Sequence, residues 1–149
     1  MAYNSGNVPV NSIIETAHEA QKHRGEDGFG FVEILEDEIK LHRFVYKKDM
    51  LDVLRNSKSK CILFHSRIPT STTNNVKSNH PIFTDANVYN HNYYLIHNGH
   101  IYNADNLEDQ HKLYGLEYNT YEDTKFTDSE SLLHEIVMIA EGLNDPKLF

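Results

Sequence analysis

The chain has 149 residues, of which 14 are Lys or Arg and 22 are Asp or Glu, so its formal net charge is -8. This length suits one domain spanning residues 1–149, and a hydrophobic content of 39% is enough to close a core. The acidic balance argues against a nucleic-acid partner, because phosphate binding needs clustered Lys and Arg. The single Cys excludes an internal disulfide and a Cys-rich zinc module.

Membrane and secretory classes are also disfavoured. The longest apolar stretches, such as residues 61–64, are far shorter than the ~20 residues that a membrane span needs. Residues 1–20 contain no basic patch followed by an apolar core, so we predict no secretory signal. Since a lone thiol suits a reducing compartment, we expect a cytoplasmic protein.

The first third of the chain predicts a helix followed by a β-hairpin. Ser12 and Glu15 form a capping box, which predicts the start of a helix, and Gly25 predicts its end. Residues 29–35 are apolar and rich in β-branched side chains, which favours a strand. The alternation in residues 39–44 favours the second strand of a hairpin.

The middle of the chain predicts a short helix, a strand and a long loop. Residues 49–55 form an amphipathic pattern typical of a helix, and the apolar run 61–64 predicts a strand buried on both faces. Residues 69–81 hold three Thr, two Ser, three Asn and two Pro. A polar loop of this length in a compact domain is usually functional or mobile.

The last third predicts a second hairpin and two helices. Asn98-Gly99 between residues 93–97 and 100–102 is a strong signal for a tight β-turn. Residues 107–116 predict a helix, and a second capping box at residues 127–130 predicts the start of another. The sequence therefore predicts an α+β or layered α/β fold.

Arg67 lies just after a predicted strand and just before the polar loop. A guanidinium at a strand end can bind a carboxylate through two hydrogen bonds, which suits an amino-acid ligand. An ordinary surface ion pair is the alternative. This residue is therefore a candidate only in combination with others.

Two further positions complete such a combination. The Asn98 amide and the Gly99 backbone N–H can point together at a developing oxyanion, although a plain hairpin turn explains them equally well. Asp128 lies in the first turn of a predicted helix, where the helix dipole favours a negative charge; this is also a common stabilising arrangement. A cation for a carboxylate, an anion for an ammonium group and an oxyanion donor pair describe an α-amino acid undergoing acyl transfer.

Four segments carry a resemblance to a known family. They read RGEDGFG at residues 24–30, HSRIPT at 65–70, HNGHI at 97–101 and DSE at 128–130, and His80-Pro81 follows the loop. In this order they resemble the motifs of class II glutamine amidotransferases. These are N-terminal-nucleophile enzymes that include glucosamine-6-phosphate synthase, amidophosphoribosyltransferase and asparagine synthetase.

The resemblance implies a fold, a reaction and a set of roles. The fold would be an αββα sandwich of two antiparallel sheets, and the reaction hydrolysis of the glutamine side-chain amide to glutamate and ammonia. Arg67 would bind the α-carboxylate with Thr70 beside it, and Asp128 would hold the α-ammonium group. Asn98 and Gly99 would form the oxyanion hole, with His97 of the same segment counted among the substrate-binding residues. No cofactor is implied.

The chain departs from the family at both ends. The family's nucleophile is an N-terminal Cys whose own α-amino group acts as the base, whereas this chain opens with Met1-Ala2. We expect Cys61 to be a core residue that cannot replace it. The family also continues with further strands after its D-[ST]-E helix. We therefore expect a sandwich truncated at both ends, whose open sheet is covered by a partner chain, by a second copy or by a rearranged terminus.

Three functions follow as hypotheses. The first is an inactive domain that still binds L-glutamine or a related small amide, or serves as an interaction module. The second is an active glutaminase whose true start, with the Cys, lies upstream. The third is a structural protein on the same scaffold. A metal site is not expected, because His91, His97 and His100 do not follow a known zinc spacing.

Overall fold

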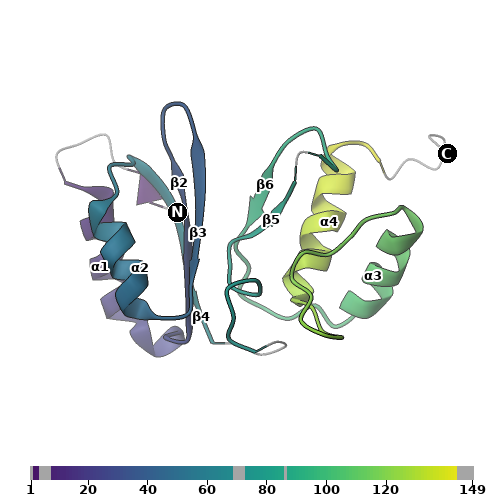
Figure 1. The fold of residues 1–149 in the computed structure, drawn as a ribbon, viewed down its shortest axis with the longest axis horizontal. Helices are drawn as coiled ribbons and strands as arrows, with labels where there is room; N and C mark the ends of the chain where they lie inside the picture. Colours follow the sequence, from purple (N-terminus) through teal and green to yellow (C-terminus); the bar gives the residue numbers. More distant parts are fainter. Residues whose placement is uncertain (1, 4–7, 69–72, 86, 144–149) are drawn as a thin grey trace. The chain divides into compact units, whose positions relative to one another are not determined.

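The computed structural model describes residues 2–3, 8–68, 73–85 and 87–143. The chain divides into two compact units, Met1–Pro81 and Ile82–Phe149, called unit 1 and unit 2 below, and each is described by itself. Both units combine helices with antiparallel strands (Figure 1), so the predicted α+β class is confirmed. Within the described ranges, no helix is both long and apolar enough to span a membrane.

Unit 1 contains an antiparallel sheet with β2 (Gly28–Ile34) at its centre. β2 forms a hairpin with β3 (Ile39–Phe44) and pairs along its whole length with β4 (Cys61–Arg67). The two-residue strand β1 (Ala2–Tyr3) extends the sheet at the other edge of β4. The predicted hairpin is confirmed.

Strand β4 differs from its prediction in length and in burial. It continues three residues beyond the apolar run 61–64, as far as Arg67. Only Ile62 and Arg67 are buried, and its other residues are half-buried, so the prediction of a strand buried on both faces is wrong. The apolar run identified the strand, but a strand near the edge of a sheet keeps partial exposure.

Two helices cover one face of this sheet (Figure 1). They are α1 (Val10–Gln21), which continues into the 3-10 turn η1 (Lys22–Arg24), and α2 (Lys47–Asn56). Their apolar side chains join those of the strands in one core, whose buried members are Val10, Ile14, Phe29, Phe31, Met50, Leu54 and Ile62. The sequence thus predicted both helices. In α2 the predicted apolar side also matches the buried side chains Met50 and Leu54. In α1 the apolar residues at helical spacing, Ile13, Ala17 and Ala20, are exposed, so the predicted face is wrong.

The capping box predicted at Ser12 is wrong. Helix α1 begins at Val10, and its N-cap residue Pro9 makes no side-chain capping bond. Ser12 lies inside the first turn, where its carbonyl oxygen accepts a hydrogen bond from Thr16 Oγ1 at 2.9 Å. The buried side chain of Val10 adds a core contact at the start of the helix, and packing decides this boundary instead of the local signal.

Unit 2 contains a two-stranded sheet and two helices. Strands β5 (Ile82–Thr84) and β6 (Tyr93–Leu95) pair antiparallel, and α4 (Asp128–Ala140) packs on them. Helix α3 (Ala104–Leu113) packs against α4 (Figure 1). Both predicted helices are present; α3 begins and ends three residues before its predicted limits. The core beneath α4 is formed by Ile82, Tyr89, Leu133, Val137 and Met138.

The hairpin predicted around Asn98-Gly99 is wrong. Strand β6 pairs with β5, and residues 100–102 form no strand. A tight turn of the type that Asn-Gly favours needs a positive φ at both central residues, and neither Asn98 nor Gly99 has one. The segment instead connects β6 to α3, so Asn98-Gly99 does not form a turn between paired strands.

A cluster of His and Tyr side chains, called the histidine cluster below, lies in unit 2. The Tyr89 hydroxyl is 2.8 Å from His134 Nδ1, and the Tyr118 hydroxyl is 2.7 Å from His111 Nδ1. His111 Nε2 lies 3.0 Å from a carboxylate oxygen of Glu135, and the rings of Tyr118 and His134 stack at 4.9 Å. Both histidines are almost fully buried, so the interface between α3 and α4 contains titratable groups.

Within this cluster, protonation is most clearly unfavourable at His134. Burial lowers its pKa to about 4, and the neighbouring His111 contributes to the lowering. Its Nε2 atom is buried without a hydrogen-bond partner in the described part of the chain. A proton there would create a positive charge with no acceptor, so the folded unit requires a neutral imidazole.

Unit 2 is therefore expected to lose stability in acid. Below pH 6.5 the unfolded chain protonates His134 while the folded chain does not, so stability falls as the pH drops toward about 4. The group contributes up to about 3 kcal/mol to that loss. Measuring the free energy of unfolding by urea at pH 7 and pH 4.5 should show a smaller loss for His134→Gln than for the wild type. The exposed His23→Gln variant should behave as the wild type, and equal losses in all three proteins would contradict the prediction.

Candidate functional site

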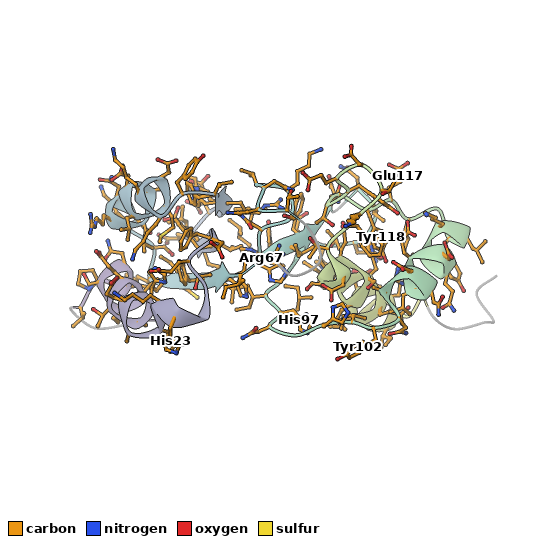
Figure 2. All side chains as sticks on the ribbon, turned by 90° about the horizontal axis from the view of Figure 1, so that it is seen from below. His23, Arg67, His97, Tyr102, Glu117 and Tyr118 are labelled. Atoms are coloured by element: carbon orange, nitrogen blue, oxygen red, sulfur yellow. The ribbon has the colours of Figure 1, made fainter. Side chains whose placement is uncertain are left out.

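Arg67 ends strand β4 in unit 1 (Figure 2). Its backbone pairs with Gly28 of β2, and its carbonyl oxygen accepts a hydrogen bond from the Asp27 N–H at 3.2 Å. The side chain is buried, and Nη1 donates to the carbonyl oxygen of Ser78. Since a carbonyl oxygen carries no net charge, this contact orients the guanidinium without neutralising it.

Three glycines of residues 24–30 let other backbone segments approach. A Cβ on Gly25 would lie 2.8 Å from the backbone of Arg67, and one on Gly28 would overlap the Asn79 side chain. A Cβ on Gly30 would overlap the carbonyl oxygen of His80. The segments RGEDGFG and HSRIPT and the pair His80-Pro81 therefore meet in unit 1, and the glycines are the reason that they fit together.

The described part of the polar loop is fixed by buried amides that sequence reasoning missed. Asn79 is fully buried, and its Nδ2 donates to the carbonyl oxygen of Phe44 at 2.8 Å and to Asn74 Oδ1 at 3.3 Å. Asn74 in turn donates to the carbonyl oxygen of Asp27. Ser78, also fully buried, donates to the carbonyl oxygen of Thr73 at 2.9 Å. The abundance of Asn was the available signal, but it does not reveal which amide is buried.

Asp128 is the first residue of α4 in unit 2, as the sequence predicted. Its Oδ2 accepts a hydrogen bond from the Ile101 N–H at 2.7 Å and lies 3.0 Å from His100 Nδ1. The Asp128 side chain is only 10% exposed. Both contacts are made by Oδ2 and neither by Oδ1. Together they hold the carboxylate in place. The carboxylate thus joins the HNGHI and DSE segments.

A second contact joins the same segments. His97 Nδ1 lies 3.0 Å from Ser129 Oγ on α4. A Cβ on Gly99 would lie 2.6 Å from His97 Nε2, so the imidazole occupies the space that a larger residue at position 99 would need. A side chain at position 99 would therefore require the His97 ring to shift, and the glycine is not part of a β-turn. Asn98 and Gly99 are both exposed.

Glu130 determines where helix α4 begins. Its carboxylate is fully buried and accepts hydrogen bonds from the N–H groups of Asn119 at 2.6 Å and Thr120 at 3.0 Å, and from Thr120 Oγ1 at 2.6 Å. Thr120 Oγ1 also accepts the Thr127 N–H at 2.9 Å. The predicted start of the helix is correct, but Thr127 makes no side-chain capping bond. Glu130 connects the helix to a distant loop instead.

The candidate residues thus form two groups. Unit 1 holds Arg67 with the glycine-rich segment, and unit 2 holds His97, Gly99 and Asp128 around the start of α4. Thr70 lies outside the described residues.

The three histidines considered for a metal contact separate groups of unit 2. His91 lies 3.4 Å from Glu141, whereas His97 contacts Ser129 and His100 contacts Asp128. In the described ranges, no cluster of three or more His, Cys, Asp or Glu side chains is arranged to hold a metal ion.

The sequence matches no protein-family model, and no curated protein is significantly similar to it.

The close approach at Gly30 gives a test of unit 1. Gly30→Ala should reduce the free energy of unfolding by about 2 kcal/mol or more, because the methyl group would displace the backbone of His80. Gly115→Ala is the control: that glycine has open space around it but a φ of 73°, so about 1 kcal/mol of backbone strain is expected. Urea unfolding measures both, and a Gly30→Ala variant as stable as the wild type would refute the close approach.

The Glu130 contacts give a matching test of unit 2. In Glu130→Gln an amide NH₂ group would face N–H donors, so we expect a loss of about 2–4 kcal/mol in the free energy of unfolding. Glu117→Gln, an exposed substitution in the same region, should change it by less than about 0.5 kcal/mol. Equal unfolding midpoints for the two variants would show that the buried carboxylate does not hold the helix start.

Proposed function

We propose that the chain is a glutamine amidotransferase type-2-like domain that binds L-glutamine. The carrying observation is that the four family-like segments meet in pairs, residues 24–30 with 65–67 in unit 1 and 97–101 with 128–130 in unit 2. Each pair places one charged side chain of the required sign, a guanidinium in unit 1 and a carboxylate in unit 2. These are the groups that an α-amino acid needs.

The roles follow from charge and placement. Arg67, oriented by the carbonyl oxygen of Ser78, binds the α-carboxylate, with Thr70 beside it. Asp128, held through Oδ2, binds the α-ammonium group. The exposed Asn98 amide and Gly99 N–H receive the oxygen of the side-chain amide, and His97 keeps their loop against α4.

The proposed architecture is an αββα sandwich. Helices α1 and α2 cover the face of the first sheet that carries Phe29 and Phe31, so Val32 and Leu63, which are paired in register, belong to the opposite face. Helix α4 covers Ile82 of the second sheet, which leaves the stacked pair Phe83 and Tyr94 on its other face. Each sheet thus carries apolar side chains on the face away from its helices.

The nucleophile of the family reaction is not supplied by Cys61. Cys61 and Arg67 occupy opposite ends of β4, and six residues of strand span about 20 Å. The thiol is therefore far from a ligand held at Arg67, and it has no terminal amine to act as its base. For the chain as given we propose ligand binding without turnover.

A second candidate function, glutaminase activity, is favoured by the register of β1. Ala2 pairs with Ile62 and Tyr3 with Cys61, antiparallel. A strand continuing β1 in this register would place the fourth residue ahead of Met1 opposite Arg67. An N-terminal Cys at or near that position would reach the proposed carboxylate site. We propose that activity requires this extension.

Substituting Arg67 tests ligand binding. Calorimetric titration with L-glutamine should show saturable heat for the wild type. Arg67→Ala should weaken binding by ~2–5 kcal/mol, because a buried charge-assisted contact is lost. Arg43→Ala is the matched control, since Arg43 donates to the neighbouring carbonyl oxygen of Lys77 at 2.7 Å without a proposed ligand role. Asp128→Asn should also weaken binding while keeping an acceptor for the Ile101 N–H.

Three outcomes separate the functions. Saturable heat without glutamate in the cell supports the binding domain, and accumulating glutamate establishes turnover. No heat, with folding verified by thermal denaturation, overturns both and leaves a structural or interaction role. Binding equally weakened by Arg43→Ala and Arg67→Ala would refute the carboxylate assignment.

A further inference from the structure

His100 directly follows Asn98-Gly99 and contacts the carboxylate of Asp128. Its Nδ1 lies 3.0 Å from Asp128 Oδ2, and its side chain is 50% exposed whereas that of Asp128 is 10% exposed. A solvent-accessible imidazole therefore lies on a nearly buried carboxylate. Under the proposed function, that carboxylate receives the ammonium group of the ligand.

The other groups around His100 do not compete for this contact. The ring of Tyr102 meets the His100 ring edge-on at 4.8 Å, and Tyr102 itself is 93% exposed at the outer surface of unit 2 (Figure 2). His97 of the same loop bonds to a serine hydroxyl on α4. Glu130, the other acid in the first turn of α4, is bonded to residues 119 and 120. The ionic partner of His100 within the described part of unit 2 is Asp128.

We propose that His100 gates the ammonium site of this domain. A neutral imidazole donates a hydrogen bond to Asp128 and leaves the negative charge of the carboxylate available to a ligand cation. A protonated imidazole neutralises that charge and repels the ammonium group, because two positive charges would share one carboxylate. This inference rests on the proposed function, since it assumes that Asp128 binds an α-ammonium group.

The gate makes glutamine binding depend on pH in a defined direction. Imidazole side chains take up a proton between about pH 8 and pH 5, whereas glutamine stays zwitterionic between pH 7.5 and 5.5. Acidification from pH 7.5 to 5.5 should therefore raise the Kd for L-glutamine, by up to about a hundredfold when one proton is linked to binding. Binding near pH 6 should release up to about one proton, because the complex disfavours the imidazolium.

Calorimetric titration of the whole chain with L-glutamine at pH 7.5 and 5.5 tests the gate. In His100→Gln the ratio of the two Kd values should fall to less than about a third of the wild-type ratio, because an amide does not titrate in this range. His91→Gln is the matched control: His91 also lies beside a carboxylate of unit 2, Glu141 at 3.4 Å, but not beside Asp128. It should keep the wild-type ratio.

A second readout does not depend on any variant. Repeating the wild-type titration at pH 6 in buffers of different ionisation enthalpy gives the number of protons released on binding. A wild-type Kd independent of pH, binding without proton release, or an unchanged ratio in His100→Gln would each overturn the gate while leaving the proposed function standing. Absence of glutamine binding by the wild type at pH 7.5 would overturn the proposed function itself.

Discussion

The candidate site of unit 2 depends on one buried carboxylate, that of Glu130. A fully buried charge is stable only when hydrogen bonds replace its lost hydration, and here three donors from residues 119 and 120 do so. Because Thr120 also accepts the N–H of Thr127, the network fixes the residue that precedes α4. Asp128 follows directly and is placed at the helix start, where its carboxylate can bind the loop after β6.

In unit 1 the main constraint is the close approach of separate backbone segments. The glycines at positions 25, 28 and 30 leave room for the end of β4 and for the segment ending at Pro81. Buried amides then satisfy the polar groups that this packing removes from water, as Asn79 does for the carbonyl oxygen of Phe44. At this junction the guanidinium of Arg67 donates a hydrogen bond to the carbonyl oxygen of Ser78.

The proposed binding function requires fewer groups from the chain than catalysis would. Ligand recognition needs only fixed charges of the right sign and exposed donors, and these come from residues within each unit. Turnover needs in addition a nucleophile with its own base, which Cys61 in β4 does not supply. The His100–Asp128 contact lies at the carboxylate to which we assign the ammonium group, and the proposed gate rests on it.

The sequence by itself determined the hairpin of β2 and β3, the presence of four α-helices and the candidate residues. Apolar patterns together with helix start and stop signals located these elements, whereas strand β5 was not predicted. Tertiary structure decided what local signals could not. Asn98-Gly99 predicts a β-turn, yet β6 pairs with β5, and Gly99 lies close to the His97 ring. The Glu130 carboxylate reads as a capping group, yet it binds a loop ten residues away, since hydrogen-bond partners distant in sequence become neighbours only in the folded chain.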